Sequence, residues 1–130
     1  MIEGGCCCGA VRFSVSEKPT FAAACHCSRC RKVGMTPFAI VKAEQVEILS
    51  GRESLVDYVP EQGFEHLRCF CGRCGTSMGE MTSDEAMYPI PLDCFDDDLG
   101  LELRFHEHVA TKPSWAVIPE GVKQFEGDPS

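Results

Sequence analysis

The sequence of 130 residues contains no long apolar run. No stretch approaches the roughly 20 apolar residues that a membrane-spanning helix needs, so we expect no membrane partner. The first five residues, Met1 to Gly5, lack the basic start and apolar continuation of a secretion signal. We therefore expect a cytoplasmic protein, in which thiols stay reduced.

The chain is also poor in positive charge. It has 12 Lys and Arg against 20 Asp and Glu, which gives a formal net charge of −8. Because such a chain repels phosphate backbones, we expect no nucleic-acid partner. The few basic residues gather near cysteines, at Arg29, Arg31, Lys32, Arg68 and Arg73. A local basic pocket on an acidic protein fits a small anionic ligand better than a polymer.

Long helical segments are absent as well, because prolines interrupt the chain throughout. Short apolar or alternating runs predict strands at residues 10–15, 37–41, 46–49, 54–59, 67–70 and 101–105. Gly51 lies between two of these runs and predicts a hairpin turn. The best helical candidate is short, with Ser28 as its cap and Gly34 at its end. The sequence predicts a mostly β domain of residues 1–130 with one or two short helical turns.

Cysteine, in contrast, is abundant. Seven of the ten cysteines form three clusters, Cys6-x-Cys8, Cys25-x-Cys27-x-x-Cys30 and Cys71-x-x-Cys74. In a reducing compartment such spacing favours metal binding over disulfides. A structural zinc site has four protein ligands, whereas a catalytic one keeps three and leaves a position open. Seven ligands fit one site of each kind, although spacing alone does not say which four belong together.

The outer clusters predict chelating pairs. Two residues separate Cys71 and Cys74, and Gly75 allows a tight turn after them. On a strand, Cys6 and Cys8 would point to the same side, while Cys7 would point away as a small buried apolar residue.

The middle cluster is the functional candidate. If Cys30 lies in the first turn of the short helix, Arg31 and Lys32 would help to stabilise its thiolate. An open position at three sulfurs could then bind water or a substrate thiol. Alternatively both sites are closed, with a fourth ligand from His26, Cys69, Cys94, His66, His106 or His108.

Three of these side chains have simpler interpretations. Cys69 and Cys94 are expected in the core, and His26 could orient a ligand instead of binding metal. Trp115, the only tryptophan, is expected in the core or in a pocket wall.

Four sequence blocks resemble the glutathione-dependent formaldehyde-activating enzyme (GFA) family, which also includes centromere protein V. The blocks are Gly5-Cys6-x-Cys8-Gly9-Ala10-Val11-Arg12-Phe13, Cys25-His26-Cys27-Ser28-Arg29-Cys30-Arg31-Lys32, Arg68-Cys69-Phe70-Cys71-x-x-Cys74-Gly75-Thr76 and His108-Val109-x-x-Lys112-Pro113-x-Trp115. They follow one another in the family's order. Two departures stand out: Cys7 replaces a residue that is often apolar, and the segment 91–96 replaces a glycine-containing turn.

The resemblance implies a small zinc-stabilised β-sheet fold with two zinc ions per chain. Cys6, Cys8, Cys71 and Cys74 would hold the structural zinc, and Cys25, Cys27 and Cys30 the catalytic one. The implied reaction joins glutathione, or a related small thiol, to formaldehyde and gives S-(hydroxymethyl)glutathione, formally a carbon–sulfur lyase reaction in reverse. Arg31, Lys32 or Lys112 would bind the carboxylates of glutathione.

Family membership does not by itself establish an activity, because function belongs to the site and not to the fold. The alternative is a non-enzymatic, zinc-stabilised binding module. The two hypotheses can be distinguished by experiment. The enzyme hypothesis predicts a thiol-binding site and two zinc ions per chain, one of which is easily removed.

Overall fold

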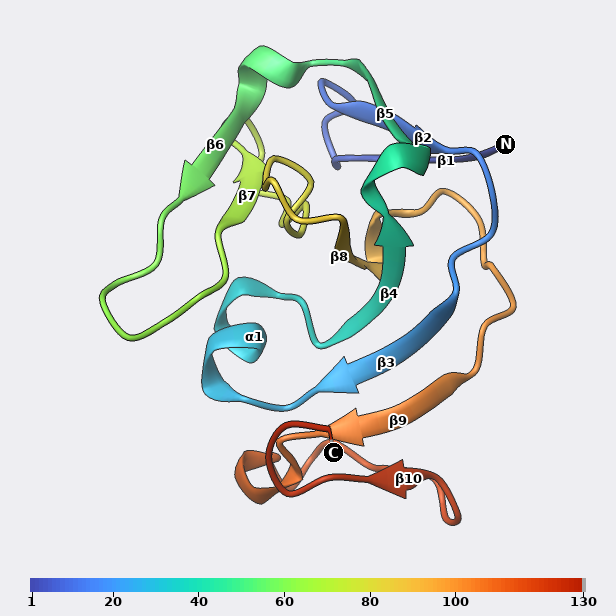
Figure 1. Cartoon of the computed structure of the whole chain (residues 1–130), viewed down its shortest axis with the longest axis vertical. Helices are drawn as coiled ribbons and strands as arrows, with labels where there is room; N and C mark the ends of the chain where they lie inside the picture. Colours follow the sequence, from blue (N-terminus) through green and yellow to red (C-terminus); the bar gives the residue numbers. More distant parts are fainter. Residues whose placement is uncertain (130) are drawn as a thin grey trace.

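The computed structural model describes residues 1–129, and Ser130, the last residue of the predicted domain, lies outside the described residues. Strands dominate, as the sequence predicts (Figure 1). The first sheet has the order β1 (Ile2–Gly5), β2 (Arg12–Val15) and β5 (Val46–Ser50). The second has the order β10 (Lys123–Gln124), β9 (Leu103–Glu107), β3 (Phe21–Cys25), β4 (Pro37–Lys42) and β8 (Met87–Pro91). A third pairs β6 (Leu55–Tyr58) with β7 (Arg68–Cys71).

Helical structure is limited to short pieces. Within residues 1–129 there is one α-helix, α1 (Ser28–Val33), and four 3₁₀ turns, η1 (Ala43–Gln45), η2 (Arg52–Ser54), η3 (Leu92–Cys94) and η4 (Val109–Thr111). None of the helices in this described part is long and apolar enough to cross a membrane. The mostly β fold with short helical turns is thus confirmed.

The predicted hairpin at Gly51 is wrong. Strand β5 pairs with β2, and β6 pairs with β7, so the strands on either side of Gly51 belong to different sheets. Gly51 has φ +79°, and a Cβ built on it would lie 2.0 Å from the carbonyl oxygen of Ala10. The glycine therefore lets the chain turn closely over the backbone just before β2 as it passes from one sheet to the next.

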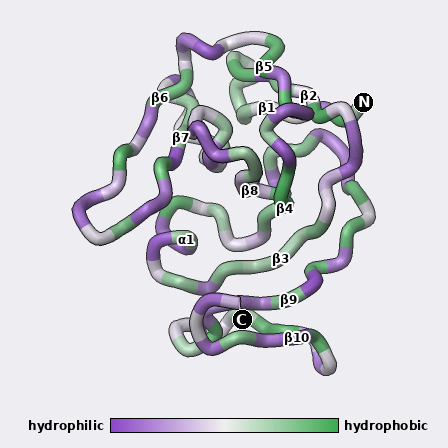
Figure 2. The backbone as a smooth tube through the Cα atoms, viewed as in Figure 1, coloured by the Kyte–Doolittle hydropathy of each residue, from purple (hydrophilic) through white to green (hydrophobic). Residues whose placement is uncertain are grey.

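Strand β3 lies at the centre of the five-stranded sheet, antiparallel to β4 and parallel to β9. Its Ala22, Ala23 and Ala24 are all buried. The hydrophobic residues of β4 continue this apolar layer (Figure 2). Strand β3 ends at Cys25, so the middle cysteine cluster begins where the central strand of the sheet ends.

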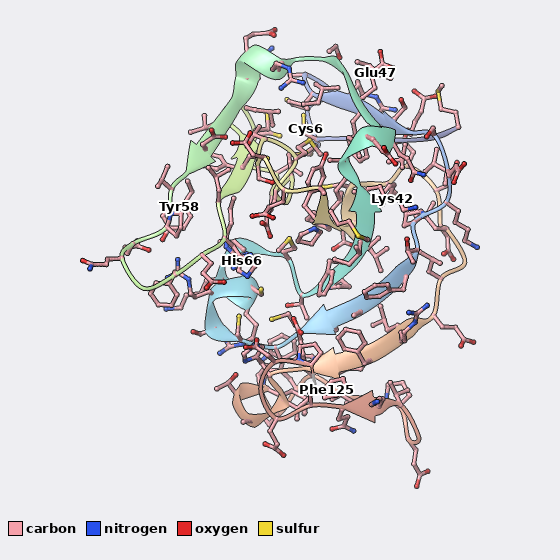
Figure 3. The ribbon with its side chains drawn as sticks, viewed as in Figure 1. Cys6, Lys42, Glu47, Tyr58, His66 and Phe125 are labelled. Atoms are coloured by element: carbon pink, nitrogen blue, oxygen red, sulfur yellow. The ribbon has the colours of Figure 1, made fainter. Side chains whose placement is uncertain are left out.

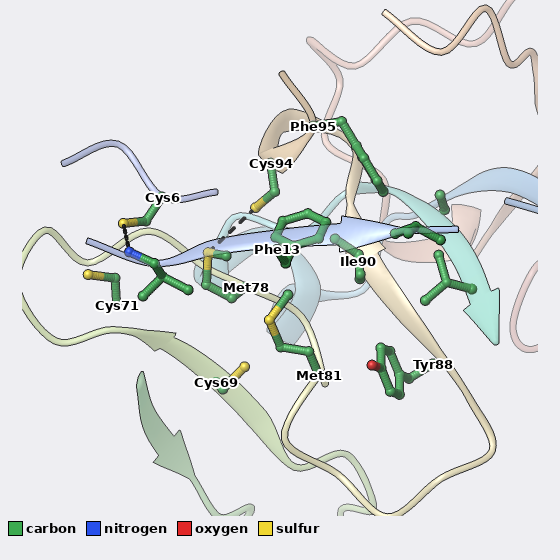
Figure 4. Close-up of a cluster of buried hydrophobic side chains, with 14 residues drawn as sticks. Cys6, Phe13, Cys69, Cys71, Met78, Met81, Tyr88, Ile90, Cys94 and Phe95 are labelled. Carbon is green, nitrogen blue, oxygen red and sulfur yellow. Dashed lines mark hydrogen bonds between the residues drawn. The ribbon is translucent and has the colours of Figure 1, made fainter. Parts of the chain in front are cut away.

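A hydrophobic core fills the space between the first sheet and the edge of the second. Phe13, Met78 and Ile90 are fully buried there (Figure 4). Cys69 and Cys94 also belong to this core, as predicted, and the Cys94 thiol donates to the carbonyl oxygen of Ser77 at 2.9 Å.

Trp115 is not in the core or in a pocket wall, since 78% of it is exposed. It lies within a turn in which the Ala116 amide donates to the Pro113 carbonyl at 3.1 Å. The Lys112 ammonium closes the same segment by donating to the Ala116 carbonyl at 2.5 Å. These hydrogen bonds lie within the turn, and the indole of Trp115 is left exposed to solvent.

Candidate metal centre and its pocket

Four cysteines from the two outer clusters converge on one point. The sulfur atoms of Cys6, Cys8, Cys71 and Cys74 all lie within 4.8 Å of one another. The Sγ–Sγ distance is 3.6 Å from Cys6 to Cys8 and 3.9 Å from Cys8 to Cys71. Four sulfurs placed tetrahedrally at zinc–sulfur bond lengths lie about 3.8 Å apart. The donor set therefore fits a closed zinc site.

Cys6 and Cys8 converge through a turn, and the predicted strand geometry at this pair is wrong. Strand β1 ends at Gly5, and the Gly9 amide donates to the Cys6 carbonyl at 3.1 Å. The Val11 amide donates to Cys6 Sγ at 3.2 Å, which fixes that sulfur.

Cys7 is exposed and not buried as predicted, because it occupies the outer corner of this turn. Its amide donates to Thr76 Oγ1 at 3.0 Å, which joins the turn to the segment that carries Cys74. Hydrogen bonding from the same Thr76 lowers the pKa of Cys74 to about 5. The turn and its partner segment thus favour a thiolate where a metal ligand is expected.

The middle cluster forms a second group, in which Cys25 ends β3 and Cys27 and Cys30 belong to the start of α1. The three sulfurs lie within 4.8 Å of one another, with 3.4 Å between those of Cys25 and Cys27. Within residues 1–129, no fourth His, Cys, Asp or Glu donor atom lies within 4.8 Å of all three. The set fits a zinc ion with one position open.

The helix itself positions these ligands. Its N-cap is Cys27 and not Ser28: the Cys27 backbone is extended, and its Sγ accepts from the Cys30 amide at 3.3 Å. Cys30 lies in the first turn, as expected, and Gly34 ends the helix with φ 80°. A thiolate can replace the usual hydroxyl or carboxylate cap because it too accepts a hydrogen bond.

A buried arginine lies against this group. Arg68, on β7, is 6% exposed, and its Nη2 donates to Cys30 Sγ at 3.6 Å. Hydrogen bonding with Cys25, and then with Arg68, lowers the pKa of Cys30 to about 5. Hydrogen bonding with Cys30, and then burial, raises the pKa of Cys25. Arg68 Nη1 is buried and has no hydrogen-bond partner among the described residues.

Two histidines near the cysteines are paired with each other. His26 Nε2 lies 2.8 Å from His106 Nδ1, and burial lowers the pKa of both rings. The His26 amide donates to the Glu107 carbonyl at 3.0 Å, and the His26 carbonyl accepts from Thr111 Oγ1 at 3.1 Å. His26 thus holds the link from Cys25 to Cys27 against β9, as expected of a residue that orients ligands.

The three sulfurs open into a polar pocket of about 650 Å³. Charged side chains from three parts of the chain form its walls, including Arg29, Lys32, His66 and Asp128. Figure 3 shows His66 above the helix, where the β6–β7 loop covers one side of the site. The His108 Nε2 lies 2.9 Å from an Asp128 oxygen, so the C-terminal segment supplies the opposite wall.

A second pocket of about 270 Å³ meets two of the three cysteines, Cys25 and Cys30. Its walls are mainly apolar and include Phe21, Met35, Phe38, Ile40 and Phe105. The three-cysteine group therefore lies where a polar and an apolar pocket join.

The three cations predicted to bind carboxylates lie in different surroundings. Lys32 is exposed and lines the polar pocket. In residues 1–129, Arg31 and Lys112 are not among the residues that line either pocket, and Lys112 donates to backbone carbonyls. Sequence reasoning gave Arg68 no specific role at the site and missed Glu107. A basic residue within a strand, three positions before a metal-ligating pair, was the available signal for Arg68.

Comparisons with known proteins agree with the four sequence blocks. A family model described as glutathione-dependent formaldehyde-activating enzyme matches residues 1–112. A Halomonas elongata protein, provisionally named a glutathione-dependent formaldehyde-activating enzyme, is 31% identical over 131 aligned positions, which cover 91% of this chain and 81% of that protein. The crystal structure of a Rhodobacter sphaeroides protein, a structural-genomics target, matches with a TM-score of 0.60 and 25% identity, covering 78% of this chain and 97% of that one.

Proposed function

This chain belongs to the glutathione-dependent formaldehyde-activating enzyme family, and on that premise we propose that it joins glutathione and formaldehyde at the three-cysteine group. The observation that carries the proposal is the junction of Cys25, Cys27 and Cys30 with a polar pocket large enough for a tripeptide. The reaction adds the glutathione sulfur to the carbonyl carbon, and the carbonyl oxygen takes a proton. The product is S-(hydroxymethyl)glutathione.

The two cysteine groups have separate roles in this proposal. Cys25, Cys27 and Cys30 would hold a catalytic zinc, and Cys6, Cys8, Cys71 and Cys74 a structural one, giving two zinc ions per chain. The catalytic zinc would supply an open coordination position that favours the ionised form of an incoming thiol. The buried Arg68 guanidinium offsets the negative charge that three thiolates concentrate there.

The cations of the polar pocket would orient glutathione. Lys32 presents an exposed ammonium to the pocket, and charge-assisted hydrogen bonds from such groups to carboxylates are strong. Arg29 lies in the same wall but already contacts Glu61 at 3.1 Å. Lys32 is thus the first choice for a glutathione carboxylate, while the roles of Arg31 and Lys112 stay predictions.

Acceleration of the addition itself tests the proposal. Thiols and formaldehyde combine without a catalyst, so the measurement is the exchange rate between ¹³C-formaldehyde and its glutathione adduct, by NMR, with and without protein. We expect acceleration by the wild type and by Cys7→Ser, whose thiol belongs to neither cysteine group. Cys27→Ser should reduce the acceleration at least tenfold. Equal rates with and without the wild type would refute the proposal.

Cobalt substitution tests thiol binding apart from catalysis. The protein with cobalt in both sites should show tetrahedral thiolate spectra, and millimolar glutathione should shift those of one site. A spectrum that stays unchanged would favour the alternative, a non-enzymatic zinc-stabilised binding module. Cys27→Ser is the control, because the shift should disappear while the four-cysteine spectrum remains.

A further inference from the structure

The two pockets that meet at the three-cysteine group differ in chemistry. Side chains found only in the polar pocket include Arg29, Lys32 and Asp128. Those found only in the apolar one include Met35, Phe38 and Phe105. A tripeptide with two carboxylates suits the first pocket and not the second, because burying a carboxylate among apolar side chains is costly. The glutathione of the proposed reaction therefore leaves the apolar pocket vacant.

The residues shared by the two pockets mark where the reacting atoms would meet. They are Cys25, Cys30, His66, Arg68 and Glu107. Arg68 is 94% buried and its Nη1 is unpartnered among the described residues, although a buried donor without a partner is costly. A substrate oxygen at this junction would supply the missing acceptor. A carbonyl oxygen that gains negative charge as sulfur adds to its carbon is the group that such a donor stabilises best.

Formaldehyde has one carbon and one oxygen, and would leave most of a 270 Å³ apolar pocket empty. We propose that this pocket holds the carbon substituent of the carbonyl substrate, so that the preferred partners of glutathione are apolar aldehydes larger than formaldehyde. The inference rests on the proposed function and specifies its substrate class. The step is balanced: sulfur bonds to the carbonyl carbon, the π electron pair moves to oxygen, and oxygen takes the proton that the thiol released. The product is a thiohemiacetal, and no oxidant or reductant is needed.

Binding of two stable glutathione thioethers tests the pocket without catalysis. In S-hexylglutathione the alkyl chain occupies the place of the aldehyde substituent, whereas S-methylglutathione lacks it. Each buried methylene adds roughly fourfold in affinity. We expect the hexyl compound to bind the zinc-loaded protein at least tenfold more tightly. Ile40→Phe, which fills the pocket, should abolish the advantage, and Leu49→Phe, on the exposed face of β5, should keep it. Less than twofold preference, or a preference that survives Ile40→Phe, overturns the inference.

Exchange rates distinguish this inference from the proposed function. We expect the wild type to accelerate addition of glutathione to 3-phenylpropanal at least tenfold more efficiently, in kcat/KM, than addition to formaldehyde. Ile40→Phe should lower that ratio tenfold, and Leu49→Phe should not change it. Acceleration with formaldehyde alone would refute the inference and leave the proposed function standing. No acceleration with either aldehyde would refute both. A rate that responds to longer thiols, but not to longer aldehydes, would also overturn the assignment of the pocket.

Discussion

In the apolar pocket beside the three-cysteine group, the carboxyl group of Glu80 is buried next to a single ionic partner, His66. The residue is 4% exposed, and an oxygen of its carboxylate lies 3.3 Å from Nδ1 of His66. Hydrogen bonding with Glu80 raises the pKa of His66 above its ordinary value. Because a buried carboxylate needs a charged or hydrogen-bonded partner, His66 is held at the wall shared by both pockets.

The first prediction concerns this pair. Replacing Glu80 by Gln removes the negative charge, so the pKa of His66 should fall towards the value of a free histidine. A raised folded-state pKa stabilises the protein below the unfolded pKa, near 6.5, and the gain is lost as the pH rises through the folded pKa. The free energy of unfolding lost by Glu80→Gln should therefore be larger at pH 5.5 than at pH 8.

NMR titration of the His66 ring and urea unfolding at the two pH values check this prediction. Glu85→Gln is the matched control, because Glu85 is an exposed acid in the neighbouring turn. An unchanged His66 titration in Glu80→Gln would show that another group raises the pKa.

Individual ligands were the most predictable part of the site. Cysteine spacing indicated only that seven thiols fit one group of four and one of three. The family resemblance assigned the outer two clusters to the group of four, and the structure brings together those four cysteines and the remaining three. Arg68 was less predictable, because its position opposite Cys30 depends on how β7 packs against α1, far away in sequence. Cys7 and Trp115 were predicted wrongly, since turn geometry and not residue type decides their exposure.

Among the elements, the loop between β6 and β7 covers one side of the polar pocket. The guanidinium of Arg29 lies 3.7 Å from the ring centre of Phe64 and 3.1 Å from a Glu61 oxygen. A cation–π contact and an ion pair that are both open to solvent are weak, because water screens the charges. Arg29→Ala should therefore open this loop several-fold more often without unfolding the protein.

Hydrogen exchange of amides in residues 59–67 measures the loop opening. Arg52→Ala removes an equally charged but exposed side chain elsewhere and should leave these rates unchanged. If Arg29→Ala also left them unchanged, the loop would have to be held by other contacts.

A second element-level prediction concerns the passage from β5 to β6. Gly51 and Gly34 both have φ near +80°, which costs a residue with a side chain roughly 1–2 kcal/mol. A Cβ at Gly34 meets nothing within 4 Å, whereas one at Gly51 meets the backbone of Ala10. Gly51→Ala should therefore destabilise the protein by clearly more than Gly34→Ala. Thermal unfolding in the presence of zinc compares the two variants. Equal losses of stability would mean that the backbone near Ala10 shifts at little cost to accommodate the new Cβ.

Two of the strands that sequence reasoning missed have clear physical reasons. Strand β3 contains three consecutive alanines, a residue that favours helices, and tertiary burial overrides that preference. Strand β8 contains Pro89 and Pro91, which would weaken a central strand, but β8 lies at the edge of its sheet. The local sequence pattern therefore missed strands whose formation depends on tertiary burial, as in β3, or on a position at the edge of a sheet, as in β8.

At the scale of the whole molecule, the four-cysteine group links two different sheets. It connects the turn after β1, in the three-stranded sheet, to the last residue of β7, in the two-stranded sheet, and to the turn that follows β7. Structural zinc sites contribute about 10–16 kcal/mol in small zinc domains, and the net stability of a domain is about 5–15 kcal/mol. If the four-cysteine group binds zinc as proposed, losing that zinc would cost enough free energy to unfold the protein.

The last prediction compares ligands of the two groups. Cys71→Ser should leave the chain unfolded or metal-poor, because it removes a buried ligand of the four-cysteine group. Cys27→Ser should leave a folded protein with about one zinc ion, since the three-cysteine group lies at a pocket and not between sheets. Cys7→Ser, the neighbouring thiol outside both groups, should keep two. Elemental analysis and circular dichroism of freshly purified protein measure both quantities. If Cys71→Ser and Cys27→Ser unfold alike, the division into a structural and a catalytic site is wrong.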